Sequence, residues 1–183
     1  MIFMYDRLEG NNVVLRKARL DDLELMYDRV WSDSRCCKYM LWEVNKSLEE
    51  ARDRLERTIN YHKDHYAYFI TLKDSDEVIG FAGLKEVEPN VYEDSGVCIA
   101  YDYQGKRLGR ESVSLLLDLV FNELNADKVI LSCFKVNEAS RGMILSLGFK
   151  YFKDGKITRE HDNKEFDTEY YYLDKDMYKK ELW

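Results

Sequence analysis

The stretch "YDYQGKRLGRESVSLLLDLVF", residues 101–121, joins a polar, glycine-containing loop to an amphipathic helix. Its second half has apolar residues at the three- and four-residue spacing of one helix face. They are Val113, Leu116, Leu117, Val120 and Phe121, and Leu124 continues the same spacing just beyond the stretch. Its first half contains two glycines and the cations Lys106, Arg107 and Arg110. The pattern predicts a helix whose N-terminus follows bare backbone and positive charge.

The start of this helix has the chemistry of an anion site. The first N–H groups of a helix have no partners inside it, and the helix dipole adds partial positive charge. Gly105 and Gly109 would let the backbone approach a ligand closely, and the cations could surround a pyrophosphate. The stretch is neither a P-loop, GxxxxGK[ST], nor a GxGxxG fingerprint. Physical chemistry alone leaves two interpretations open, a phosphate site and a loop with solvated cations.

The segments around this stretch predict a mixed α/β domain. Strands are predicted at residues 13–19, 66–73, 77–87, 91–101, 128–134, 149–155 and 165–173. Helices are predicted at residues 20–31, after Ser47 and at 138–147, and Ser47 with Glu50 forms a capping box. The order is strand, helices, three strands, helix, strand, helix and two strands. Antiparallel strands followed by a strand–helix–strand crossover are typical of such an order.

Composition limits the classes of function. The chain has 183 residues, of which 45% are hydrophobic, and one proline, so we expect residues 1–183 to form a single domain. A net charge of −7 gives no support for nucleic-acid binding and favours a cationic partner such as an amine. The four cysteines have no CxxC or zinc spacing, and no segment resembles a signal peptide or membrane span. The sequence predicts a cytoplasmic protein with no metal and no membrane partner.

Three motifs, in order, resemble the GNAT N-acetyltransferase family. The residues "QGKRLGR" resemble its acetyl-CoA signature, [Q/R]xxGx[G/A], with Arg107 at the position of the central glycine. Downstream, "VNEASRGMILSLGFKYF" resembles the second motif and contains Asn137 and Ser140. Upstream, "VVLRKARLDDLELMYDRVWSD" and "MLWEVNKSLEEARDRLE" resemble the ribosomal-protein N-acetyltransferase branch. The resemblance covers residues 13–173, nearly the whole chain.

The resemblance implies a fold and an activity. The GNAT fold has a mixed, mostly antiparallel sheet, splayed between its strands 4 and 5, with helices on both faces. The activity is transfer of an acetyl group from acetyl-CoA to a primary amine by direct attack in a ternary complex. The branch favours a protein N-terminal amine. The alternatives are a small amine, such as a polyamine or an aminoglycoside, and a catalytically silent acyl-CoA-binding module. The strand sequence "EYYYL", residues 169–173, suits either a homodimer edge or an acceptor wall.

The resemblance also assigns the acetyl-CoA site. The strand at residues 91–101 would splay from the strand at 128–134, and the pantetheine arm would bind backbone groups in that gap. The signature loop would hold the pyrophosphate, and Asn137 would anchor the arm. The implied contacts are Val97, Cys98, Ile99, Gln104, Gly105, Lys106, Arg107, Leu108, Gly109, Arg110 and Asn137.

Acetyl transfer to an amine needs a proton acceptor and a proton donor. An amine with an ordinary pKa of about 10 must lose a proton before it attacks a thioester. Glu93 and Asp94 stand where related enzymes carry a carboxylate that acts through water, although both could be solvated residues at a strand start. Ile144 occupies the position of the usual tyrosine acid. The resemblance therefore implies Ser140 as the donor to the thiolate, directly or through water.

Other reactive side chains have simpler interpretations. Cys98 and Cys133 fall on predicted strands without a histidine partner, so we expect small core residues rather than acetylated nucleophiles. His62 and His65 lie near a helix end without further metal ligands, and we expect structural roles. Acceptor selectivity is expected in residues 31–47 and 156–164.

Overall fold

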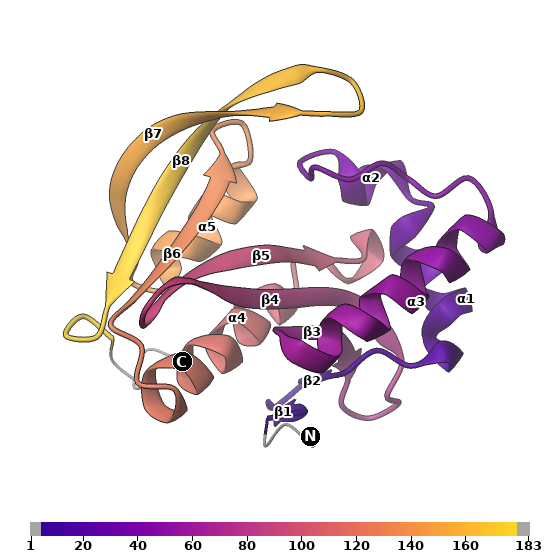
Figure 1. The fold of residues 1–183 in the computed structure, drawn as a ribbon, viewed down its shortest axis with the longest axis horizontal. Coiled ribbons are helices and arrows are strands. Elements are labelled where there is room, and N and C mark those ends of the chain that lie inside the picture. The colour runs from indigo at the N-terminus through magenta and orange to yellow at the C-terminus, as the bar shows by residue number, and fades with distance from the viewer. Residues whose placement is uncertain (1–4, 179–183) are drawn as a thin grey trace.

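One eight-stranded sheet runs through the molecule (Figure 1). The computed structural model describes residues 5–178, so residues 1–4 and 179–183 of the predicted single domain lie outside it. The strands are β1 (Arg7–Glu9), β2 (Val13–Arg16), β3 (Tyr66–Leu72), β4 (Val78–Glu88), β5 (Val91–Ile99), β6 (Lys128–Phe134), β7 (Lys150–Arg159) and β8 (Lys164–Asp174). Their order is β1-β2-β3-β4-β5-β6-β8-β7, and among these neighbours only β5 and β6 are parallel. The predicted mixed, mostly antiparallel sheet is confirmed.

Helices cover both faces of this sheet (Figure 1). They are α1 (Leu23–Met26), α2 (Ser34–Cys37), α3 (Leu48–Asp64), α4 (Leu108–Asp118) and α5 (Glu138–Ser146). Because side chains alternate along a strand, successive residues of β3 enter different cores. Tyr68 and Ile70 pack in the core under α4, whereas Phe69 packs in the core beside α1 and α3.

The short elements are where prediction and structure differ. β1 and α2 were not predicted, because elements of three or four residues show no usable periodicity. β2 ends at Arg16 rather than at residue 19. Ser47 caps α3 as expected, since its Oγ accepts the Glu50 amide at 3.2 Å. The Glu50 carboxylate accepts the amide of Lys46 at 2.7 Å, one residue earlier than the predicted capping box requires.

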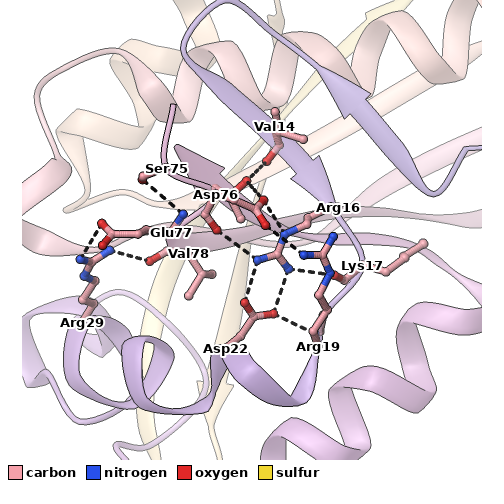
Figure 2. Close-up of polar contacts among 12 residues, drawn as sticks. Val14, Arg16, Lys17, Arg19, Asp22, Arg29, Ser75, Asp76, Glu77 and Val78 are labelled. Atoms are coloured by element: carbon pink, nitrogen blue, oxygen red, sulfur yellow. Dashed lines mark hydrogen bonds and ion pairs between the residues drawn. The ribbon is translucent and has the colours of Figure 1, made fainter. Parts of the chain in front are cut away.

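A buried charge network ties the first helical segment to the sheet (Figure 2). Arg16 on β2 donates to both carboxylate oxygens of Asp22, at 2.9 and 2.7 Å. These side chains are only 5% and 7% exposed. Arg16 also donates to Asp76 in the β3–β4 turn, and Arg19 donates to the other Asp76 oxygen, both at 2.9 Å. One guanidinium thus holds the strand, the turn and the segment that leads into α1.

His62 is a buried residue of α3, and its side chain contacts the segment after β2. Its Nδ1 accepts the backbone amide of Ala18 at 3.0 Å, and its ring lies edge-on to Phe69. Burial, with the nearby charge of Lys17, lowers the pKa of His62 to about 3. A neutral ring whose Nδ1 accepts a hydrogen bond carries its proton on Nε2. His62 therefore joins α3 to the segment after β2.

Candidate active site

The parallel strands β5 and β6 form a fork. They pair at only three positions, the last being Glu93 opposite Ile130. Beyond that pair, β6 diverges from β5 together with β7 and β8 (Figure 1). Asp94 and residues 97–99 of β5 continue to pair with β4 on their other side. The predicted splay is therefore present, and it leaves the backbone of Val97 and Ile99 facing the gap rather than a neighbouring strand.

Asp94 lies at the point where the fork opens. Its Oδ2 accepts the backbone amide of Ser132 on β6 at 3.0 Å and the Ser132 hydroxyl at 3.4 Å. The amide that would continue the ladder is therefore taken by a side chain. Burial raises the pKa of Asp94, and this outweighs the two hydrogen bonds from Ser132, which lower it. A carboxylate with a raised pKa is a stronger base than an ordinary one.

Glu93 lies on the opposite face of β5. Its neighbour Tyr92 belongs to the core under α4, so alternation directs Glu93 toward the side of α1 and α3. Burial, followed by the charges of Glu93 and Asp94, raises the pKa of Tyr170 on β8. The charges of both candidate bases thus act on Tyr170, which belongs to the segment that sequence analysis left open between a homodimer edge and an acceptor wall. Tyr170 pairs with Ser132 on β6, and Ser132 contacts Asp94. This pairing could not be known before the fold.

A β-bulge follows these carboxylates. Leu84 on β4 pairs with Asp94 and Ala82 pairs with Val97, so Ser95 and Gly96 together oppose one residue of β4. Gly96 has φ of 115°, a backbone conformation that side chains rarely adopt. The bulge turns the strand immediately before the predicted pantetheine contacts.

The signature loop leads into α4 through a left-handed residue. Arg107, the N-cap of α4, has φ 62° and ψ 11°, and it provides no side-chain cap. This is the conformation in which glycine costs least, so Arg107 keeps the geometry of the glycine that it replaces. Gly105 has φ of 75°, with open space where a Cβ would lie. Within residues 5–178, no hydrogen bond engages the backbone amides of Leu108 and Gly109, so both N–H groups are available at the helix start, where an anion is favoured.

The side chains of this loop have different roles: some fasten the loop to the fold and others are exposed. Gln104 donates to the Ile99 carbonyl at 2.9 Å and so fastens the loop to the end of β5. Arg110 donates to the hydroxyl and carbonyl oxygens of Ser146, which joins α4 to α5. Leu108 is buried, so its side chain belongs to the core. Lys106 and Arg107 are exposed, with Lys106 over the ring of Tyr103.

Asn137 and Ser140 lie on the other arm of the fork. Asn137 is the N-cap of α5, and its side-chain oxygen accepts the Ser140 amide at 3.2 Å. This contact places the Ser140 hydroxyl in the first turn of α5, just beyond the end of β6. Cys98 and Cys133 are buried, and contact with Cys36 together with burial raises the pKa of Cys98. Burial raises the pKa of Cys133 to about 11, so both thiols stay protonated, in keeping with core roles.

Two adjoining hollows lie beside α3. The smaller, about 140 Å³, is lined by α3 residues and by Ser95 and Gly96 of the bulge. The larger, about 450 Å³, is lined by Trp42, Glu43, Asn45 and residues of α3. Both hollows share Arg54, Thr58 and Tyr61 as lining residues. The smaller hollow therefore lies next to the larger one and reaches the strand segment that precedes the predicted pantetheine contacts.

The two segments in which selectivity was expected meet at this side of the molecule. Arg159, at the end of β7, donates to the carbonyls of Lys38 and Met40, both at 3.3 Å. Trp31 and Trp42, from the first of these segments, line the hollows. Between residues 5 and 178 there is no cluster of three or more His, Cys, Asp or Glu side chains suited to a metal ion. Nor does any helix in that range have the length and apolar character needed to cross a membrane.

The fork, the bulge and the glycine-like turn before α4 together define an α/β protein with a site for an extended, phosphate-bearing cosubstrate. The chain belongs to the family described as acetyltransferase (GNAT) domain, which matches residues 12–150. It is therefore an acetyl-CoA-dependent N-acetyltransferase that transfers an acetyl group to an amine.

Relatives agree with this assignment. The uncharacterized N-acetyltransferase p20 of Bacillus licheniformis is 27% identical over 155 residues, covering 83% of this chain and 85% of that protein. A GNAT-family acetyltransferase from Bacillus anthracis has a TM-score of 0.79 at 21% identity, covering 93% and 99% of the two chains. The ribosomal-protein-S5-alanine acetyltransferase of Vibrio fischeri has a TM-score of 0.70 at 19% identity, covering 94% and 98%. These two structures share its fold.

Proposed function

We propose that the acceptor is the N-terminal amine of a protein and that residues 1–183 act as one catalytic domain. The observation that carries this proposal is the pair of adjoining hollows, which joins an open surface to the bulge at Ser95 and Gly96. An open-ended site of this kind admits the end of a chain. The fold shared with a ribosomal-protein acetyltransferase supports the same choice. A cytoplasmic location and a homodimer stay predictions from the sequence.

The residues of the fork fit acetyl-CoA. Acetyl-CoA supplies an activated thioester and, at its other end, a pyrophosphate. The backbone amides of residues 107–109, with the charge of Lys106, would hold the pyrophosphate. Backbone groups of residues 97–99 would bind the pantetheine arm, and Asn137 would anchor it from α5. The left-handed backbone of Arg107 supports this fit, because the turn already has the shape that a glycine would give.

The catalytic roles follow from the arms of the fork. Asp94 would accept a proton from the amine through water, aided by the raised pKa of its carboxyl. Glu93, on the opposite face of β5, is the second candidate for this role. The Ser140 hydroxyl, held in the first turn of α5, would donate a hydrogen bond to the leaving thiolate.

The alternative functions fit the site less well. A polyamine or aminoglycoside carries several positive charges into a hollow that Arg54 and Arg57 line, where like charges repel, whereas the N-terminus of a chain brings only one. A silent acyl-CoA-binding module would result if Arg107 blocked the start of α4, and the left-handed conformation of Arg107 argues against such a block.

Replacing Arg107 by glycine should leave acetyl-CoA binding nearly unchanged. Because Arg107 already has the glycine conformation, we expect the affinities of parent and Arg107→Gly to agree within about threefold by calorimetric titration. Release of left-handed strain should also stabilise the variant by up to about 1 kcal/mol. Arg107→Ala, which removes the charge but keeps the strain, is the matched control. Binding by Arg107→Gly alone would mean that the Arg107 side chain closes the site.

The acceptor class can be tested by the rate of CoA release. With acetyl-CoA saturating, we expect kcat/KM for unblocked peptides to exceed that for spermidine and kanamycin by at least about 10-fold, which corresponds to about 1.4 kcal/mol of discrimination. Peptides whose N-terminus is already acetylated and that contain an internal lysine are the control, because a side-chain amine is then the only amine that can react. Faster turnover of either small amine would overturn the protein N-terminus as acceptor.

A further inference from the structure

Arg54 is a half-buried cation without a carboxylate partner. Its guanidinium lies between two indole rings, 4.9 Å from the centroid of Trp31 and 4.5 Å from that of Trp42. Its hydrogen bond to the neutral side chain of Asn45 is long, at 3.4 Å. Across residues 5–178, no Asp or Glu forms an ion pair with it. Buried arginines are ordinarily paired, so the Arg54 guanidinium is suited to bind an anion.

The surroundings of Arg54 also favour an anion, because they are positively charged. Arg57, one turn along α3, lines the larger hollow. Burial, with a smaller contribution from the charge of Arg57, lowers the pKa of Arg54 to about 10. Glu43 is the acidic residue that lines the larger hollow, and it pairs with Lys46 at 3.6 Å on the surface. Trp42 Nε1 is buried and has no hydrogen-bond partner among the described residues. The hollow is therefore locally cationic, although the whole chain has a net charge of −7.

Arg54 also lies close to the strand segment where the acetyl group would be transferred. It lines the smaller hollow together with Ser95 and Gly96, and that hollow has a volume of only about 140 Å³. Gly96 directly precedes the predicted pantetheine contacts. A group bound by Arg54 therefore shares a confined space with the strand segment beside which the acceptor amine would react.

We propose that Arg54, assisted by Arg57, binds a carboxylate of the acceptor, so that the preferred acceptor is a protein N-terminus with an acidic side chain next to its amine. Arg54 would act as a specificity residue: its planar guanidinium, held by two indoles, presents a preset fork to a carboxylate. This inference rests on the proposed function for the peptide part of the acceptor. It also revises the expectation, based on net charge, of a cationic acceptor.

The test compares peptides that differ only in charge. Ala-Asp-Asp-Gly-Gly amide and Ala-Asn-Asn-Gly-Gly amide would be titrated into the full chain with CoA bound, followed by calorimetry and by emission of Trp31 and Trp42. Free aspartate forms a third arm. The variants are Arg54→Gln, the charge-keeping Arg54→Lys and the exposed Arg57→Gln. Arg52→Gln, the same change at an exposed position of α3, is the matched control.

We expect the parent to bind the Asp peptide at least about 10-fold more tightly than the Asn peptide, since hydrogen bonds to charged groups are the stronger class. Arg54→Gln should remove this preference, Arg57→Gln should reduce it, Arg54→Lys should keep part of it, and Arg52→Gln should not change it. Equal binding of both peptides by the parent would overturn the inference, whether or not Arg54→Gln folds. Binding of aspartate without binding of either peptide would keep the carboxylate site and overturn the protein N-terminus as acceptor.

Discussion

Asp94→Asn should lower kcat/KM for acetyl transfer by at least about 100-fold, the usual range for loss of a general base. The amide oxygen of the asparagine can still accept the Ser132 amide, so the fork should keep its shape. The substitution therefore removes only the ability of this side chain to accept a proton. The measurement is CoA release from acetyl-CoA and an unblocked peptide across pH, together with thermal unfolding of both proteins.

The pH profile separates catalysis from structure. Burial raises the pKa of Asp94, so the acid limb of kcat/KM in the parent should lie above the ordinary carboxyl value of about 4 and should be lost in Asp94→Asn. Because the folded-state pKa exceeds the unfolded one, ionisation of Asp94 costs the folded state free energy as pH rises through this range. An amide avoids that cost, and we expect Asp94→Asn to be no less stable than the parent at neutral pH.

Glu93→Gln is the comparison that assigns the base. Both carboxylates lie next to each other in sequence, but they point to opposite faces of β5. An Asp94→Asn rate within about threefold of the parent, with the loss appearing in Glu93→Gln, would place the base on the α3 face. Asp94 would then be a positioning residue that holds the fork through Ser132.

The long elements and the signature could be predicted because they depend on local pattern. The stripe from Val113 to Leu124 requires one buried helix face, and "KVILSCF" corresponds to β6 residue for residue. The capping serine at residue 47 and the order of the long elements along the chain follow from the same rules. Even Arg107, which breaks the signature, lies where the pattern placed a glycine.

The acceptor side could not be predicted, because it is assembled from distant segments. Arg54 reads as one more solvated cation on a helix with alternating charges, and only the fold places it between Trp31 and Trp42. Arg159 meets Lys38 across 121 residues of sequence. The Asp94 contact with Ser132 depends on where the β5–β6 ladder stops, which the residue types do not specify.

Asp22→Asn should cost about 3 kcal/mol or more of the free energy of unfolding, because breaking a buried ion pair leaves its partner without compensation. Arg16 would lose two short charged hydrogen bonds at a site where both side chains are almost fully buried. For a chain of this size the change corresponds to a fall in Tm of about 6–12 °C. Urea and thermal unfolding of the two proteins would measure it.

Asp21→Asn is the matched control, since Asp21 is the exposed neighbour, and we expect it to stay within about 0.5 kcal/mol of the parent. The double variant Arg16→Met with Asp22→Leu should recover most of the loss, because apolar residues of similar volume often replace a buried pair at little cost. A change below about 1 kcal/mol in Asp22→Asn would contradict this account. It would mean that Asp76, which already accepts from Arg16 at 2.9 Å, can satisfy the guanidinium alone.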